Sequence, residues 1–421
     1  MIKIINGGDG EQIFSRVISK VNVEETVGSI IKDVKERGDK ALLEYTLKFD
    51  KADLKSLRVT EDEIIKAVNS VEPKFIEILK RSAKNIRSFC EKQVRTGFEM
   101  VNADGATVGQ KVVPLDSAGL YVPGGTASYP STVLMDAIPA LVAGVKRVVM
   151  VSPPDKNGNI NPVILASAFV AGVNEIYKVG GAQAIAGLAY GTESLPKVDK
   201  IIGPGNAFVA EAKKQVFGQV SIDMIAGPSE IMVVADGKNN PAHVASDLLS
   251  QAEHDKMASA VLITDDGTFA KAVAQEIEKQ IPELERAEIA RASIDENGKI
   301  IVVEDLEKAI ELANLLAPEH LELCLDNPFE YLKKVRHAGS VFLGRNCPEA
   351  MGDYIAGANH TLPTGGTARF SSALSVDDFI KKVQYVYYDK TALDNTAKDV
   401  EYFATKEGLT AHAKSAVIRL K

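Results

Sequence analysis

Histidine and carboxylate side chains are the first groups in this chain to consider for chemistry, because they bind metal ions and transfer protons near neutral pH. The chain has six histidines. His243 lies early in a predicted helix and His337 follows a basic helix end, so we interpret both as surface or structural residues. The other four lie beside carboxylates, amides or loop residues: His254, His320, His360 and His412.

Gln251 and His254 lie three residues apart at the end of a predicted helix, so their side chains share one face. The imidazole of His254 can bind a metal ion through a ring nitrogen, and the amide oxygen of Gln251 could be a second, weaker ligand. Glutamine is an uncommon zinc ligand, and a capped helix end would explain the same residues.

Glu319 and His320 are adjacent, after a predicted helix and before a predicted strand. An acid and an imidazole in that position could form a general acid/base pair. Neighbouring side chains on an extended chain point in opposite directions, so we expect the two to act on different protons. A solvated loop pair would account for the same sequence.

A long glycine-rich loop over residues 352–366 contains Asp353 and His360. Loops of this kind often carry sites, and a carboxylate such as Asp353 could complete a metal shell. Near the C-terminus, Glu407 and His412 are another acid and imidazole close together in the sequence.

Three stretches have the composition of ligand-binding loops. Tyr121 precedes Gly124 and Gly125, which combines an aromatic ring with backbone donors. Residues 180–183, ending in Gln183, and residues 203–206, ending in Asn206, each join a strand to a helix, where phosphate can bind.

The complete dinucleotide fingerprint Gly-x-Gly-x-x-Gly is absent from these stretches, because Phe208 occupies the position of the third glycine. Spacing alone therefore leaves a nucleotide role open. Ser229, in a polar turn before a strand, can donate a hydrogen bond.

The elements that position these residues follow from hydrophobic patterning. The first hundred residues are mostly helical in pattern, with capping-box spacing between Thr60 and Glu63. Past Tyr121, short apolar strands alternate with helices, which is typical of parallel sheets covered on both faces. Strands are predicted at 147–151, 176–179, 200–202, 230–235, 260–264, 299–303, 320–324 and 340–343. We therefore expect an α/β fold of two open, mostly parallel, doubly wound (Rossmann-like) units, with a helical N-terminal region and a small helical tail from about residue 375.

Composition excludes several classes of protein. The chain has 421 residues, 45% hydrophobic and 25% charged, which is ordinary for a globular protein of roughly two to three domains. Its 49 Lys and Arg against 57 Asp and Glu give a net charge of −8, which disfavours a nucleic-acid partner. Three cysteines favour a reducing compartment over a disulfide framework. The most apolar stretch, 131–151, is interrupted by charges, so we expect no membrane span and a cytoplasmic location.

Eight ordered stretches from about residue 119 to the C-terminus carry a resemblance: GLYVPGGTASYPSTVLM, GGAQAIAGLAYGTE, GPGNAFVAEAKK, DMIAGPSEIMVVAD, SDLLSQAEHD, LAPEHLEL, GDYIAGANHTLPTGGTARF and EGLTAHAKSAV. Together they closely resemble the histidinol dehydrogenase family. The resemblance implies a zinc-dependent, NAD-linked enzyme of the last steps of histidine biosynthesis. Such an enzyme oxidises L-histidinol to L-histidine through L-histidinaldehyde with two NAD⁺.

The resemblance also implies a role for individual residues. The zinc ligands, one ion per subunit, would be Gln251, His254, Asp353 and His412. Glu319 and His320 would be catalytic, and the substrate would contact these six residues together with Ser229, His360 and Glu407. Tyr121, Gln183 and Asn206 would contact NAD.

The family is a homodimer in which the C-terminal segment of one subunit completes the site of the other, so His412 and Glu407 would come from the partner chain. We accordingly divide the chain into four parts. Residues 1–20 form an arm packing with the tail, and residues 21–120 plus 230–372 form the domain with the zinc and catalytic loops. Residues 121–229 form the NAD domain, and residues 373–421 the dimerisation segment.

Three alternatives follow from the same residues. An enzyme resembling aldehyde dehydrogenases would form a thiohemiacetal on Cys324, in a predicted buried strand, or on Cys347, in a loop. A zinc hydrolase could use Glu319 as its base, but would leave the Tyr121 and Gly203 stretches without a function. A binding protein would hold an imidazole ligand without turnover.

Overall fold

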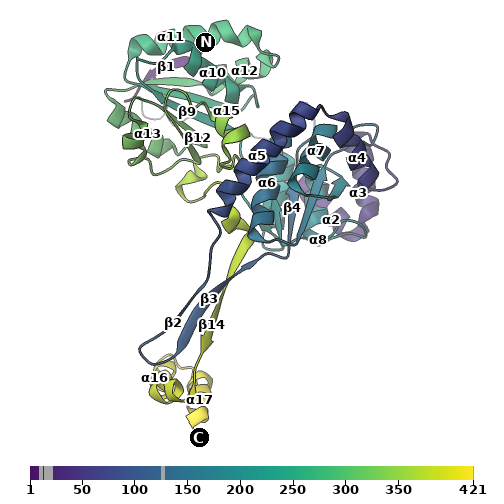
Figure 1. The fold of residues 1–421 in the computed structure, drawn as a ribbon, viewed down its shortest axis with the longest axis vertical. Coiled ribbons are helices and arrows are strands. Elements are labelled where there is room, and N and C mark those ends of the chain that lie inside the picture. The colour runs from purple at the N-terminus through teal and green to yellow at the C-terminus, as the bar shows by residue number, and fades with distance from the viewer. Residues whose placement is uncertain (9–12, 14–21, 125–128, 421) are drawn as a thin grey trace.

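The computed structural model describes residues 1–8, 13, 22–124 and 129–420. In these residues it has two parallel sheets, of five and six strands, and a three-stranded antiparallel ribbon (Figure 1). The prediction of two open α/β units is therefore confirmed.

The five-stranded sheet has the order β6-β5-β4-β7-β8, and all its strands are parallel. Its strands are β4 (Ser117–Tyr121), β5 (Arg147–Ser152), β6 (Glu175–Lys178), β7 (Lys200–Ile202) and β8 (Ser221–Ile222). Its crossover helices are α6 (Pro130–Ala143), α7 (Pro162–Ala171), α8 (Gly181–Tyr190) and α9 (Ala207–Val216). Successive strand residues face opposite sides, so Leu120 and Met150 enter one core and Tyr121 and Val151 the other. Helices on both faces bury both cores.

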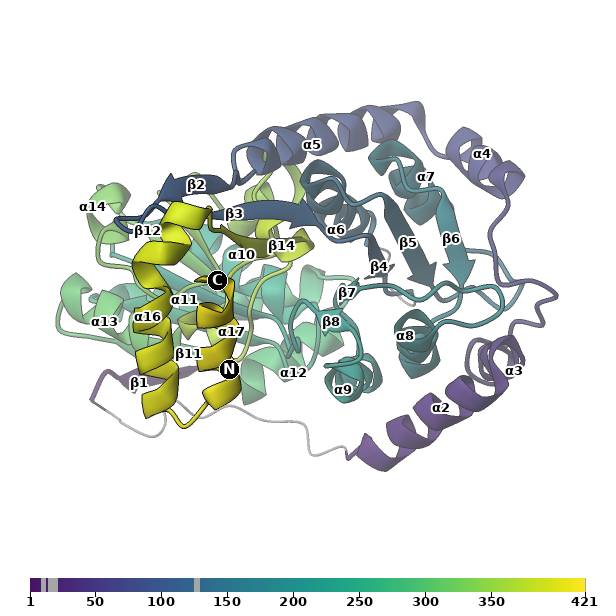
Figure 2. The ribbon, with the colours of Figure 1, turned by 90° about the horizontal axis from the view of Figure 1, so that it is seen from below.

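The N-terminal helices cover the outside of this five-stranded unit (Figure 2). They are α2 (Glu24–Arg37), α3 (Asp39–Asp50), α4 (Glu61–Ser70) and α5 (Pro73–Glu91). The capping box of Thr60 and Glu63 begins α4 as predicted. Val27 and Val34 of α2 share a core with α8, whereas Leu79 and Ile86 of α5 share a core with α6.

This packing contradicts the predicted domain that joined residues 21–120 to residues 230–372. The helices within 21–120 complete the two cores of the five-stranded unit. An amphipathic pattern identifies the buried face of a helix but not the sheet against which that face packs.

The six-stranded sheet has the order β1-β11-β10-β9-β12-β13 and is also parallel throughout. Its strands are β1 (Lys3–Asn6), β9 (Glu230–Ala235), β10 (Ser259–Thr264), β11 (Lys299–Val302), β12 (His320–Cys324) and β13 (Ser340–Leu343). Its helices are α10 (Pro241–Ala252), α11 (Gly267–Gln280), α12 (Ala287–Glu296), α13 (Leu306–Leu316) and α14 (Pro328–Leu332). Two apolar cores again lie on the two faces.

The N-terminal arm does not follow its prediction in the part that the structure describes. β1 pairs with β11 at the edge of the six-stranded sheet, and Ile2 is buried in the core of that unit. The two termini lie at opposite ends of the molecule, so the expected packing of the arm on the tail is wrong for β1 (Figure 1). Residues 9–12 and 14–20 of the arm lie outside the described residues.

A ribbon of β2 (Phe98–Val101), β3 (Thr107–Pro114) and β14 (Ile380–Tyr387) carries the tail away from both units (Figure 1). The tail ends in α16 (Lys390–Lys406) and α17 (Thr410–Val417), which pack on each other. The helical tail is confirmed from residue 390 onward. Residues 380–387 were expected to be helical and are a strand, because their β-branched and aromatic residues pair along the whole length of β3. None of the described helices is both long and apolar enough to cross a lipid bilayer.

A buried ion pair fixes the loop after β7. Lys213 of α9 pairs with Asp223, and both side chains are almost fully buried. The Lys213 ammonium donates to the carbonyl oxygen of Gly203 at 3.0 Å, and the Gly203 N–H donates to the Asp223 carboxylate at 2.8 Å. The pair therefore holds Gly203 from both sides.

We predict that Lys213→Met lowers the free energy of unfolding by about 3–5 kcal/mol, because Asp223 would remain as a buried, unpaired charge. The matched control is Lys279→Met, which removes the exposed partner of Glu276 and should change stability by less than about 1 kcal/mol. Urea denaturation of both variants measures the difference. Equal loss of stability in the two variants would contradict the conclusion that Lys213 and Asp223 form a buried ion pair that stabilises the fold.

Candidate functional site

The predicted catalytic pair, Glu319 and His320, lies at the amino end of β12 in the six-stranded sheet, beside the amino end of β9. His320 begins β12 and pairs in register with Ile231 of β9, which places Glu319 beside Glu230. Ser229, partly buried, directly precedes β9 at the same edge. The edge therefore collects side chains from two segments about 90 residues apart in the sequence.

His320 is almost fully buried, and its two ring nitrogens have different surroundings. Nδ1 lies 2.9 Å from the carbonyl oxygen of Glu230, which can only accept a hydrogen bond, so Nδ1 is the donor. Nε2 has no hydrogen-bond partner among the described residues and lies 3.7 Å from Asp353 Oδ1. Nε2 is therefore the nitrogen left for chemistry.

The carboxyl group of Glu319 approaches the same ring. Its Oε2 lies 3.6 Å from His320 Nδ1 and accepts the backbone N–H of Glu230 at 2.8 Å. The expectation that the two side chains point in opposite directions is wrong. Glu319 precedes the strand, in a turn that follows the left-handed residue Ala317 (φ 49°).

Burial and charge shift the proton affinities of both groups. Burial raises the pKa of Glu319 to about 7. Burial opposes the charged form of His320, but the carboxylates of Glu319, Asp353 and Glu349 outweigh it and raise its pKa to about 10. Perturbed groups of this kind concentrate at functional sites.

Gln251, His254 and Asp353 approach this pair from two other segments. Gln251 lies in the last turn of α10 and His254 just after it, whereas Asp353 lies in a π-helical segment, Gly352–Ala356. Asp353 Oδ2 lies 3.6 Å from His360 Nδ1, so this carboxylate sits between His320 and His360. These imidazoles lower its pKa, although burial opposes them.

The donor atoms of these residues fit a divalent cation. Gln251 is 1% exposed, and its Oε1 has no hydrogen-bond partner among the described residues, an arrangement that costs free energy unless a ligand occupies it. Burial lowers the pKa of His254 and so favours the neutral imidazole that binds metals. His320, Glu349 and Asp353 also offer ligand atoms within 4.8 Å of one another.

Glu349 is a site residue that the sequence reasoning missed. It lies in α15 (Glu349–Met351), accepts a hydrogen bond from Ser250 Oγ at 2.7 Å, and offers a carboxylate oxygen beside His320 and Asp353. No spacing in the sequence marks Glu349, since its role depends on tertiary contacts alone.

The two predicted site residues of the tail lie apart from this cluster. His412 on α17 and Glu407 after α16 are exposed at the far tip of the ribbon (Figure 1). Within one chain, the structure does not bring them to Gln251 or Asp353.

The predicted NAD residues lie at the carboxyl ends of strands of the five-stranded sheet. The hydroxyl of Tyr121, at the end of β4, accepts the Gly181 N–H at 3.1 Å. Gln183 is buried in the first turn of α8. Asn206 caps α9 by accepting the N–H groups of Phe208 and Val209.

The order of the strands creates a topological switch point at this edge. The crossovers run in opposite directions on the two sides of β4, so the point between β4 and β7 is a topological switch point. Gly203 follows β7 with φ +113°, and a Cβ atom there would lie 2.1 Å from the Tyr121 carbonyl oxygen. Only glycine therefore lets the two loops approach this closely. Residues 125–128 of the adjacent loop lie outside the described residues.

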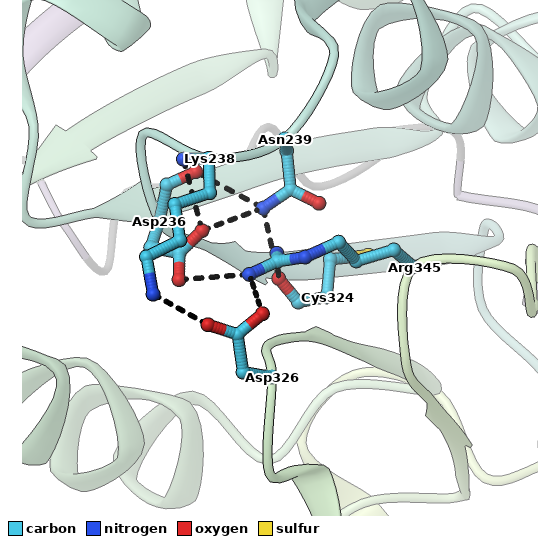
Figure 3. Close-up of polar contacts among 6 residues, drawn as sticks. All are labelled: Asp236, Lys238, Asn239, Cys324, Asp326 and Arg345. Atoms are coloured by element: carbon cyan, nitrogen blue, oxygen red, sulfur yellow. Dashed lines mark hydrogen bonds and ion pairs between the residues drawn. The ribbon is translucent and has the colours of Figure 1, made fainter.

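The carboxyl edge of the six-stranded sheet is filled by side chains (Figure 3). Arg345 donates to Asp236 at 3.0 Å, to Asp326 at 2.7 Å and to the carbonyl oxygen of Cys324. Asn239 donates to the same carbonyl oxygen at 2.8 Å. These contacts tie the ends of β9 and β12 together at the switch point of this sheet, where a doubly wound unit would otherwise receive a ligand.

The thiol groups of the three cysteines are free. Cys324 is buried at the end of β12 opposite His320, and burial raises its thiol pKa far above the usual range. Burial raises the pKa of Cys90 to about 11. Cys347 is partly buried in the loop before α15. Reactive thiols have lowered pKa values, which neither buried cysteine has.

Fold and site together fit an α/β oxidoreductase: one parallel sheet has a topological switch point at its carboxyl edge, and the other carries a buried histidine–carboxylate cluster. The chain belongs to the histidinol dehydrogenase family, whose model matches residues 15–420. It is 53% identical to the histidinol dehydrogenase of Clostridium acetobutylicum, over 100% of this chain and 99% of that protein. It is 54% identical to that of Bacillus cereus, over 96% and 94%. The crystal structure of histidinol dehydrogenase from Elizabethkingia anophelis superposes with a TM-score of 0.95 at 40% identity, covering 100% of this chain and 98% of that one.

The chain is thus an enzyme acting on an alcohol or aldehyde, as the sequence predicted, and the hydrolase and binding-protein alternatives are set aside. The thiohemiacetal alternative makes a distinct prediction. We expect Cys347→Ser to keep the wild-type rate of histidinol oxidation, because no thiol contacts the histidine–carboxylate cluster within the described part of the chain. Steady-state kinetics and resistance to a thiol-alkylating reagent test this. A fall of about a hundredfold or more in the rate of histidinol oxidation, as expected when a nucleophile is removed, would instead support the thiohemiacetal mechanism.

Proposed function

We propose that this chain oxidises L-histidinol to L-histidine through L-histidinaldehyde, with two NAD⁺ as hydride acceptors and one zinc ion per subunit. The single observation that carries the proposal is the buried, unpartnered Oε1 of Gln251 in a cluster with His254, Asp353 and the Glu319–His320 pair. An amide oxygen, a neutral imidazole and a carboxylate are a suitable donor set for zinc.

Gln251, His254 and Asp353 would hold the zinc ion, with His412 supplied by a second copy of the chain. Zinc does not change oxidation state, so it would act as a Lewis acid that binds the imidazole and amine of the substrate. Ser229, His360 and Glu407 would hold the remaining polar groups of the substrate. Neutralising the Asp353 carboxylate would also lower the pKa of His320 toward the range in which histidine acts as a base.

His320 and Glu319 divide the proton transfers between them. In the first step the alcohol loses a proton to His320 Nε2 and a hydride to the first NAD⁺. In the second step Glu319 takes a proton from the water that adds to the aldehyde. The hydrate then loses a hydride to the second NAD⁺ and a proton to His320. The unpartnered Nε2 and the raised pKa of Glu319 support these roles.

NAD would bind at the switch point of the five-stranded sheet. At that edge Tyr121 ends β4, Gln183 lies in the first turn of α8 and Asn206 caps α9, whose amino end favours an anion. The filled carboxyl edge of the six-stranded sheet supports a single nucleotide crevice per chain.

A homodimer in which the tail completes the partner's site accounts for the exposure of the tail. Tyr387, Tyr402 and Phe403 are 63%, 68% and 67% exposed, which is unusual for large apolar residues grouped on one appendage. We propose residues 373–421 as the dimerisation segment. A cytoplasmic location without a nucleic-acid partner fits the net charge of −8 and the three free cysteines.

The reaction is tested by following NADH formation with L-histidinol, in wild type and in His254→Asn. We expect the wild type to hold one zinc per subunit and to form two NADH per histidinol. The variant should lose the metal and the activity, because a ligand is missing. His243→Asn is the matched control and should keep both, because His243 is exposed on α10, the helix that precedes His254. Full zinc content and activity in His254→Asn would contradict the proposed ligand set.

The division of roles is tested with Glu319→Gln. Gln keeps an oxygen for the Glu230 N–H but cannot act as a base, so aldehyde oxidation should fall about a hundredfold or more. Alcohol oxidation should fall much less. Single-turnover measurements started separately from histidinol and from histidinaldehyde separate the two steps, with exposed Glu311→Gln as the control. Equal loss in both steps would argue against the assignment.

A further inference from the structure

Helix α6 carries two polar side chains in the middle of an apolar sequence, and both are buried. Thr132 is 3% exposed and Asp136 is 0% exposed. The other buried positions of the helix are apolar, so packing alone does not require these two groups.

One turn of α6 holds three successive residues of the loop that carries His360. The Thr361 hydroxyl donates to Asp136 Oδ1 at 2.8 Å, and the Asn359 amide donates to the Met135 carbonyl oxygen at 2.6 Å. Thr132 Oγ1 lies 3.3 Å from His360 Nε2. His360 is therefore fixed to a helix of the five-stranded unit.

The second oxygen of Asp136 faces the loop after β7. A Cβ atom on Gly203 would lie 3.2 Å from Asp136 Oδ2, and this oxygen has no hydrogen-bond partner among the described residues. Gly203 begins the loop that ends at Asn206. One carboxyl group is therefore hydrogen-bonded to the His360 loop and lies beside the Gly203 loop.

An acid at this position is unfavourable for folding. The pKa of Asp136 is raised to about 7, mainly by burial and in part by the charge of Asp223. The hydrogen bond from Thr361 and the charges of His360 and Lys213 act in the opposite direction. A buried carboxyl group with one unpaired oxygen destabilises the fold unless it has another role.

We propose that Asp136 is a positioning residue for the oxidation. Through its hydrogen bond with Thr361 it holds the His360 loop, and by filling the space beside Gly203 it limits the positions open to the Gly203 loop. It thereby fixes the substrate side of the site relative to the cofactor side. This inference rests on the proposed function of those two loops. Asp136 itself contacts neither substrate nor cofactor.

Hydrogen–deuterium exchange of the full-length holoenzyme tests the coupling of the two loops. Asp136→Ala and Thr361→Val should each raise exchange about two- to tenfold in residues 203–206 and 359–366 together, as expected for one lost hydrogen bond. Ser167→Ala is the matched control, since Ser167 is buried in the same unit but donates only to Val163 within α7. Faster exchange in only one of the two loops, or the same exchange as in Ser167→Ala, would overturn the proposal.

Kinetics distinguish positioning from a merely structural role. Asp136→Ala and Thr361→Val should raise the KM for histidinol and lower kcat, with zinc content unchanged. Asp136→Asn, which keeps an acceptor for Thr361 and has the same shape, should restore both parameters. Unchanged kcat and KM in Thr361→Val, or failure of Asp136→Asn to restore them, would contradict the proposal.

The two readouts separate this inference from the proposed function. If the wild type forms no NADH from histidinol, the proposed function fails, while the exchange comparison still decides whether Asp136 couples the loops. If the wild type is active and the exchange of the two loops is unaffected, only the inference about Asp136 fails.

Discussion

Buried polar atoms need partners, and this constraint organises the centre of the molecule. Most buried groups here are satisfied by strand pairing, helix caps or ion pairs such as Lys213 with Asp223. The Oε1 of Gln251 and the Nε2 of His320 have no hydrogen-bond partner among the described residues. Both belong to segments that converge on Asp353, which is where we propose that the metal ion and the substrate bind.

The two α/β units use opposite edges of the same kind of sheet. In the five-stranded unit the proposed cofactor residues lie at the carboxyl ends of the strands, where Gly203 and Tyr121 approach closely. In the six-stranded unit Glu319 and His320 lie at the amino end of β12, and Arg345 ties the carboxyl ends of β9 and β12 together. The proposed function therefore assigns the two units different edges, one for the cofactor and one for the acid/base residues.

Eight of the eleven strands in the two parallel sheets could be predicted from the sequence, because parallel strands buried on both faces are continuous apolar runs. The strands β1, β4 and β8 were missed. The ribbon strands β2 and β14 were also missed, because nearly all of their residues are exposed and the alternation of buried and exposed positions that marks a strand is lacking. The candidate site depended on ordered motifs, because spacing alone cannot bring Gln251 and Asp353 together. Glu349 and Asp136 carry no local signal, since each is defined by a contact made across the fold.

The pairing of β1 with β11 has a consequence for the order of assembly during translation. The sheet and crossover helices of the five-stranded unit come from one continuous stretch, residues 24–222, but Leu374, Val376 and Phe379 complete one of its cores. That unit therefore reaches its full core only after most of the chain has been made. The first strand has to wait for a partner almost three hundred residues later. Until it docks, β11 presents an open backbone edge to neighbouring nascent chains, a hazard that shortening the amino terminus would make permanent.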